Sequence, residues 1–230
     1  MTSDDDTRPA GADLGSLTVR TFDAVLFDMD GTLIDSMPGA LRAWADWAAE
    51  HHVDPARMTG LGGLPAVRII SELLPADQVD AGVRRIAELE TAMAAAGIEL
   101  LPGTAETLAT LPGDRVAIVT SCTRELLASR LAGSGLAAPA EIVTVDDVAR
   151  GKPHPDPFLL AAERLGADPR RCLVVEDAPA GLAAGRAAGC ATLAVGATHP
   201  RHELDADGHA PDLSHVVFHV RPDGISIGPR

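Results

Sequence analysis

Short apolar runs, each stopped by polar residues or glycine, recur along the chain and predict buried parallel strands. Strands covered on both faces are continuously hydrophobic instead of alternating. The runs are Asp23–Phe27, Arg115–Val119, Glu141–Val145, Cys172–Val175 and Ala191–Val195, with Val216–Phe218 as a candidate last edge strand. Helical segments separate them, at Gly103–Leu111, Thr123–Leu131, Asp156–Leu165 and Ala180–Ala188. This alternation favours right-handed βαβ units and a doubly wound α/β fold with a parallel sheet.

One long segment breaks the alternation and predicts an all-helical insertion after the first strand. The segment contains only helical patterns, at Leu41–Glu50, Ala66–Leu74 and Ala76–Ala96. We therefore expect a flexible acidic tail at 1–20, an α/β core at 21–36 and 101–230, and a helical cap at 37–100. Such a cap could act as a lid over a ligand site or form an additional layer without motion.

Composition narrows the class of protein. The chain has 230 residues, of which 46% are hydrophobic, and a formal net charge of −14. This composition is typical of a globular protein, and the absence of a basic stripe argues against nucleic-acid binding. No apolar run reaches the length of a membrane span, and the N-terminus lacks the apolar region of a secretory signal. Cys122, Cys172 and Cys190 have no metal-type spacing, so we expect free thiols and a cytoplasmic location.

The basic residues are eighteen arginines and a single lysine, Lys152. The lysine lies in the segment Gly151–Pro157, where three prolines restrict the backbone. A lysine held on a stiff loop is a positioned point charge suited to phosphate. The alternative, a solvated surface lysine, is disfavoured because arginine serves at every other basic position.

Acidic residues follow the predicted strands at their carboxyl ends, where ligands bind in such sheets. Asp28 and Asp30 are two positions apart, which places both carboxylates on the same side of an extended chain. Glu176-Asp177 supplies a second acidic pair, and oxygen ligands without histidine or cysteine favour Mg²⁺. The alternative to metal binding is that acidic residues at strand ends cap the next helix. This alternative stays open for Glu176-Asp177, and it is the preferred interpretation of Asp146-Asp147.

Two further groups of polar residues give weaker signals. Thr120-Ser121 follows the second predicted strand, where a hydroxyl and backbone N–H groups could cradle a phosphate or simply cap a helix. Several histidines gather near the C-terminus with irregular spacing. They are interpreted as solvated or strand-end residues, with a second metal site as the alternative. They are His199, His202, His209, His215 and His219.

Taken in order, these residues resemble the four motifs of the haloacid-dehalogenase-like phosphohydrolase superfamily. The motifs are Asp28-Met29-Asp30-Gly31-Thr32, Thr120, Lys152 and Glu176-Asp177. The resemblance covers about residues 22 to 220 and implies a Rossmann-like core with a helical cap inserted after the first motif. The segments Gly151–Pro157 and Glu176–Gly189 are most similar to glycerol-phosphate and deoxysugar-phosphate phosphatases. The sugar-phosphate mutases are near relatives.

The resemblance implies a phosphatase that works through an aspartyl-phosphate. Asp28 would attack phosphorus, and Asp30 would protonate the leaving oxygen and later take a proton from water. Mg²⁺ would be held by Asp28, the backbone carbonyl of Asp30 and Asp177, with Glu176 as a direct or water-mediated neighbour.

The resemblance also implies how the phosphate is held. Thr120 and the N–H groups that follow it, at Ser121 and beyond, would bind phosphoryl oxygens. Lys152 would bridge Asp28 and the phosphate, because a compact ammonium can reach both anions. The expected partner is a small phosphorylated metabolite, with no nucleic acid or membrane, and the expected state is a monomer or weak dimer.

Departures from related branches narrow the expected chemistry. The mutase branch carries a cap histidine where this chain has Ala40. It also carries a cap arginine, which aligns here with Gly62-Gly63-Leu64-Pro65, and Arg68 is the nearest cation. Both absences disfavour a mutase. The phosphonate-cleaving branch needs a cap lysine, and the dehalogenase branch lacks the counterparts of Asp30 and Gly31-Thr32. The segment Gly60–Pro65 is apolar, and we expect it to be mobile and to allow a range of phosphorylated sugars or polyols. A β-phosphoglucomutase-type mutase and a catalytically silent phosphate-sensing protein remain the alternatives.

Overall fold

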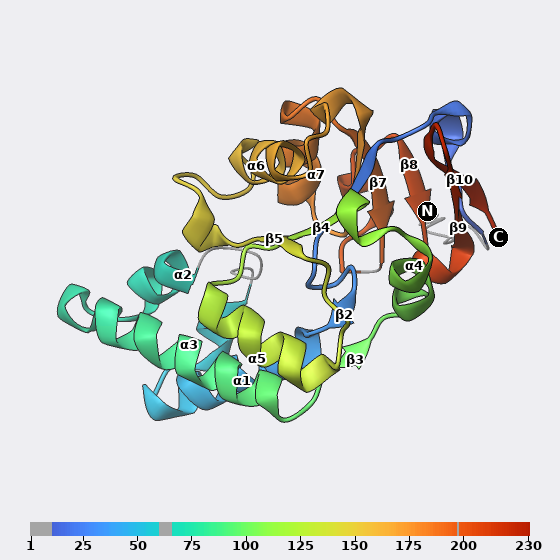
Figure 1. Ribbon diagram of the computed structural model, residues 1–230. Helices are drawn as coiled ribbons and strands as arrows, with labels where there is room; N and C mark the ends of the chain where they lie inside the picture. Colours follow the sequence, from blue (N-terminus) through green and yellow to red (C-terminus); the bar gives the residue numbers. More distant parts are fainter. Residues whose placement is uncertain (1–10, 60–65, 197) are drawn as a thin grey trace, which may run out of the picture. The chain divides into compact units, whose positions relative to one another are not determined.

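The chain divides into two compact units, each with its own core. The structure, a computed structural model, describes residues 11–59, 66–196 and 198–230 (Figure 1). Unit 1 contains the described residues up to Asp35 together with 100–124 and 136–230, and unit 2 contains 36–99 and 125–135. Among the described residues, we find no helix with the length and apolar character needed to cross a bilayer.

Unit 1 is built on a six-stranded parallel sheet, which confirms the predicted α/β fold. Its strand order is β5-β4-β1-β6-β7-β8. The strands are β1 (Ala24–Phe27), β4 (Val116–Val119), β5 (Glu141–Val143), β6 (Cys172–Glu176), β7 (Ala191–Val195) and β8 (Gly208–Ala210). The chain leaves the central β1 toward β4 and β5 and returns through β6 on the other side. This change of direction places the switch point at β1 and β6, where ligands bind in doubly wound sheets.

Apolar side chains cover both faces of this sheet, as the continuous runs require. On one face, α6 (Asp156–Arg164) and α7 (Pro179–Ala187) lie side by side (Figure 1) and pack on alternate strand residues such as Leu26 and Val174. The ring of Phe27 contacts that of Phe218, with their centroids 6.2 Å apart. Helix α4 (Thr104–Thr110) precedes β4. The strands are therefore shielded from water on both sides.

The last predicted strand does not join the main sheet, so its expected edge position is wrong. Val216–Phe218 lies in β9 (Val216–Arg221), which pairs antiparallel with β10 (Gly224–Pro229) in a separate two-stranded sheet. The sixth position of the main sheet is taken by β8, which has the sequence Gly-His-Ala and no apolar run. Phe22 bridges to Ile225, which ties this hairpin to the segment before β1.

Residues 11–20, expected as part of a flexible tail, belong to unit 1 instead and bury two leucines in it. Gly15–Val19 forms the 3-10 helix η1, and Leu14 and Leu17 are buried. Asp13 exchanges two backbone hydrogen bonds with His209 of β8, at 2.8 and 2.7 Å. Two leucines in a polar stretch are enough to anchor it, although they create no periodic pattern.

Unit 2 is helical and has a core around Trp47, Ile70 and Ile86. Its helices are α1 (Met37–Glu50), α2 (Ala66–Leu73) and α3 (Val79–Ala95), with most of α5 (Arg124–Ser134). The inclusion of α5 differs from the expected boundaries. Gly133 explains part of this inclusion, because it lets α5 approach α3 closely. A side chain at Gly133 would collide with the backbone carbonyl of Ala94 in α3.

The chain also forms short strands and 3-10 helices. Two brief strands, β2 (Ile34–Asp35) and β3 (Glu99–Leu100), pair with each other. The remaining 3-10 helices are η2 (Pro55–Met58), η3 (Ala76–Gln78), η4 (Gly113–Arg115), η5 (Val145–Asp147), η6 (Pro169–Arg171), η7 (Arg201–Glu203) and η8 (Leu213–His215).

Candidate active site

Polar residues lie at the carboxyl ends of three strands of unit 1, at one edge of the sheet. Asp28 follows β1 and Thr120 follows β4. Glu176 is the last residue of β6, and Asp177 follows it. The N–H of Asp28 donates to the carbonyl of Val175 at 2.9 Å, which continues the ladder between β1 and β6 to the first site residue. The predicted convergence of these strand ends is therefore found in the structure.

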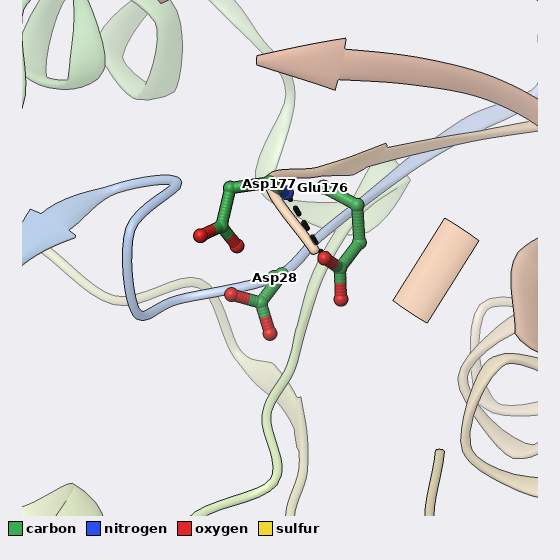
Figure 2. Close-up of side chains that lie close together, drawn as sticks. All are labelled: Asp28, Glu176 and Asp177. Carbon is green, nitrogen blue, oxygen red and sulfur yellow. Dashed lines mark hydrogen bonds between the residues drawn. The ribbon is translucent and has the colours of Figure 1, made fainter. Parts of the chain in front are cut away.

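Three buried carboxylates face one another at this edge. Asp28, Glu176 and Asp177 each offer an oxygen, and these oxygens lie within 4.8 Å of one another (Figure 2). Burial raises the pKa of Asp28 well above its usual range, Lys152 opposes this rise, and the neighbouring carboxylates add to it. Burial, followed by the charge of Glu176, raises the pKa of Asp177 to about 6. Negative charge here is costly without a nearby cation, and an all-oxygen donor set fits Mg²⁺.

Lys152 lies inside this cluster and is almost fully buried, with 5% of its side chain exposed. Its ammonium donates to Asp28 Oδ1 at 2.5 Å, to the carbonyl of Val119 at 2.8 Å and to Glu176 Oε1 at 2.8 Å. Burial lowers the pKa of Lys152, but the charges of Asp28 and Glu176 outweigh burial and raise it. Lys152 is thus a permanent positive charge held against Asp28.

Glu176 has protein partners on both carboxylate oxygens. Oε1 accepts from Lys152, and Oε2 accepts from the N–H groups of Asp177 and Ala178, both at 2.9 Å. Gly181 in α7 makes room for this carboxylate, because a side chain there would collide with it. The carboxylate therefore anchors Lys152, which favours the water-mediated form of the two metal-binding roles expected for Glu176.

Asp177 is held by two hydroxyl groups. Thr198 Oγ1 donates to Asp177 Oδ2 at 2.5 Å, and Thr32 Oγ1 donates to Oδ1 at 3.4 Å. Gly31 has φ of 81°, and a side chain there would collide with the Asp177 carboxylate. Sequence reasoning missed Thr198. Its position shortly after β7, at the same edge of the sheet, is the signal that could have found it.

Asp30 and Thr120 meet through a residue that sequence reasoning treated only as a free thiol. Cys122 Sγ donates to Asp30 Oδ2 at 3.1 Å and accepts from Thr120 Oγ1 at 3.0 Å. Thr120 Oγ1 also accepts from the N–H of Cys122 at 3.1 Å. Ser121 follows Thr120 with an exposed side chain. The structure thus brings Asp30 and Thr120 into one chain of contacts, and the phosphate-binding role of Ser121 stays a prediction.

Other polar residues have structural partners. Asp147 Oδ2 accepts from the N–H and hydroxyl of Thr144 at the start of η5, and Asp146 accepts from the N–H of Arg124. Both aspartates therefore have structural roles at helix N-termini, Asp147 in η5 and Asp146 at the start of α5, although the helical turn expected to follow them at 148–150 is not present. His209 contacts the carbonyl of Leu204 at 2.8 Å. In the part of the chain that the structure describes, the C-terminal histidines do not form a group of three potential metal ligands.

Comparison with known proteins gives matches over most of the chain. Residues 22–189 match the family described as haloacid dehalogenase-like hydrolase. Hexitol phosphatase A of Escherichia coli (strain K12) is 38% identical, over 88% of this chain and 96% of the relative. Glycerol-1-phosphate phosphohydrolase 2 of Saccharomyces cerevisiae is 34% identical, over 76% of this chain and 75% of the relative. The crystal structure of CbbY from Rhodobacter sphaeroides in complex with phosphate has a TM-score of 0.71 and 27% identity. It covers 84% of this chain and 95% of that chain.

Proposed function

Because this chain belongs to the haloacid dehalogenase-like hydrolase family, we propose that it is a Mg²⁺-dependent phosphatase of small phosphorylated sugars or polyols. The observation that carries the proposal is the buried contact between Lys152 and Asp28, next to the carboxylate of Asp177. A nucleophilic carboxylate needs a fixed cation beside it to accept an anionic substrate. Lys152 supplies that charge in this chain.

Asp28 is the proposed nucleophile. One of its oxygens attacks phosphorus in line, so that an aspartyl-phosphate forms while the bond to the leaving oxygen breaks. Asp30 gives a proton to the leaving oxygen, and then takes a proton from the water that attacks the aspartyl-phosphate. That attack releases inorganic phosphate and restores Asp28. Thr120, Ser121 and Lys152 hold the phosphoryl oxygens during both steps.

The carboxylate cluster fits a divalent cation. Mg²⁺ would be held by Asp28, Asp177 and the backbone carbonyl of Asp30, with Glu176 acting through water. When bound, Mg²⁺ supplies positive charge that reduces repulsion between the nucleophile and the phosphate. The residues of the chain have a separate role, because Thr198 and Thr32 orient Asp177 and Glu176 orients Lys152.

The proposed substrate class rests on the relatives and on the cap sequence. Two relatives are named as phosphatases of a hexitol phosphate and of glycerol 1-phosphate. Two sequence differences disfavour a mutase: Ala40 replaces the cap histidine of that branch, and Gly62–Pro65 aligns with its cap arginine, with Arg68 as the nearest cation. The segment Gly60–Pro65, expected to influence substrate range, lies outside the described residues. The cytoplasmic location and the monomeric or weakly dimeric state stay predictions.

Replacement of Asp28 by asparagine tests the nucleophile. With Mg²⁺ and p-nitrophenyl phosphate, we expect Asp28→Asn to lower kcat by about a thousandfold or more, because an amide cannot form the acyl phosphate. Asp46→Asn is the matched control, since Asp46 is an exposed residue of α1 and its replacement removes the same charge. Circular dichroism verifies that both variants fold. Activity retained in Asp28→Asn would overturn the assignment of the nucleophile.

A panel of hexitol, sugar and glycerol phosphates tests the substrate class. We expect free phosphate from several members, measured as kcat/KM and followed by phosphorus NMR. Isomerised sugar phosphate without free phosphate would instead establish a mutase. No turnover of any member with Mg²⁺ present would favour a phosphate-sensing protein.

A further inference from the structure

Cys122 connects two residues to which the proposed mechanism assigns different roles. Its thiol donates to Asp30 Oδ2 at 3.1 Å, and it accepts from the hydroxyl of Thr120 at 3.0 Å. Asp30 is the proposed acid and base, and Thr120 is a proposed phosphate ligand. The sulfur is therefore a direct hydrogen-bonded link between the proton-transferring carboxylate and the phosphate-binding loop.

The main chain fixes the place of this thiol on both sides. The N–H of Cys122 donates to Thr120 Oγ1 at 3.1 Å, and its carbonyl accepts from the N–H of Val145 at 3.1 Å. The residue is 5% exposed, so its sulfur is shielded from bulk water. A side chain held at its backbone and buried at its tip has little freedom to leave Asp30.

We propose that Cys122 is a positioning residue that holds the Asp30 carboxylate at the reacting phosphate. The inference rests on the proposed phosphatase function and adds a residue outside the four motifs to it. General acid catalysis requires the proton to lie within hydrogen-bond reach of the leaving oxygen. A small displacement of the acid therefore lowers the rate strongly. A thiol suits this role because it is a weak donor as well as a weak acceptor. It can direct Asp30 without competing strongly for its proton.

The dependence of rate on the leaving group distinguishes positioning of the acid from a general structural role. Phenyl phosphate releases phenol, which has a pKa of about 10 like the tyrosine side chain, so its departure is faster when the leaving oxygen is protonated. 2,4-Dinitrophenyl phosphate is similar in shape, but its nitro groups stabilise the leaving anion, which needs no proton. The ratio kcat/KM reports the steps up to formation of the aspartyl-phosphate, in which Asp30 acts only as an acid.

The experiment compares three cysteine variants with the wild type on both substrates in the presence of Mg²⁺. We expect Cys122→Ala to lower kcat/KM for phenyl phosphate by about ten- to a hundredfold, and for 2,4-dinitrophenyl phosphate by less than about threefold. Cys122→Ser keeps a donor and should restore most of the lost rate. Cys190→Ala should change neither substrate, because Cys190 is buried in the α6–α7 side of the core. Asp30→Asn should show the same selective loss on phenyl phosphate.

The outcomes separate this inference from the function on which it rests. Equal losses on both substrates, or no loss, in Cys122→Ala would overturn the positioning role while the wild type still releases phosphate. The serine variant keeps the test decisive if the alanine variant folds poorly, because a folded Cys122→Ser enzyme with equal losses would also refute it. Wild-type protein that hydrolyses neither substrate would overturn the proposed function, and this inference with it.

Discussion

Neutralisation of Asp177 should stabilise the metal-free protein at alkaline pH. Burial, followed by the charge of Glu176, raises the pKa of this carboxyl from 3.8 to about 6 in the folded state. The difference is about two units, and each unit corresponds to about 1.4 kcal/mol, so ionised Asp177 costs the folded state up to about 3 kcal/mol. Asp177→Asn removes this cost and keeps a side chain of the same shape.

The sign of the effect changes with pH in a defined window. Below about pH 4 the carboxyl is protonated in the folded and unfolded states, so it contributes nothing to the free energy of unfolding. As the pH rises from about 4 to 6, the unfolded chain releases the proton and the folded protein retains it. Wild-type stability therefore falls through this window, and the full cost is present above about pH 6.

Thermal unfolding with a chelator measures this directly. At pH 8 we expect Asp177→Asn to unfold at a temperature about 6 to 12 °C higher than the wild type, and the difference should shrink toward zero as the pH approaches 4. Added Mg²⁺ should stabilise the wild type more than the variant, because the variant lacks a ligand. The exposed Asp46→Asn controls for net charge. A variant no more stable than the wild type at pH 8 would refute the account of the cluster as a site that needs a cation.

Three further substitutions test other contacts of the site. Lys152→Arg keeps the charge but should lower kcat by about a hundredfold in a phosphate-release assay, because a planar guanidinium cannot match the same acceptors; a rate within about threefold of wild type would contradict this. Thr198→Val should raise the Mg²⁺ concentration for half-maximal activity by about tenfold, since it frees Asp177, and an unchanged Mg²⁺ titration would exclude that role. Gly181→Ala should lower the free energy of unfolding by about 1–3 kcal/mol, because the new methyl group displaces the Glu176 carboxylate. A variant that unfolds in urea at the wild-type midpoint would contradict this expectation.

The sheet could be predicted because its strands are buried on both faces. Each of the five predicted runs contains a strand in the structure. Strands β1, β4, β6 and β7 are buried along their whole length, and of the five only the edge strand β5 is partly exposed. No strand was predicted at β8, because its sequence Gly-His-Ala carries no such pattern, and Val216–Phe218 was placed at the edge instead. Its place in the sheet comes from pairing with β7 and from the bridge between His209 and Asp13, which are tertiary interactions.

The assignment of α5 shows a second limit of sequence patterns. Helical periodicity predicts that the segment is a helix, and the structure confirms it. Periodicity does not say which neighbour the helix packs against. The close approach of Gly133 to Ala94 joins α5 to α3 across a long sequence separation, and a glycine in a helix is a weak signal when it stands alone.

The candidate site also contains residues that the sequence identifies and residues that only the structure reveals. Asp28, Asp30 and Asp177 could be named from the sequence because strand ends of a parallel sheet meet at one edge. Cys122 and Thr198 were missed, because their contacts to Asp30 and Asp177 form only on folding, although the position of Thr198 after β7 was a usable signal. Strand-end position identifies which residues lie near the site, whereas only the structure shows which of them hold the others.

The single lysine connects composition to geometry. Arginine fills eighteen basic positions and Lys152 the remaining one. Its ammonium reaches two carboxylates and one backbone carbonyl, at Asp28, Glu176 and Val119, from a position that is 5% exposed. An ammonium directs its three donors around one nitrogen, so it fits acceptors that converge from different elements on a single point. A guanidinium spreads its donors over a rigid plane and needs more volume. The retained lysine thus follows from the shape of the buried site as well as from its charge.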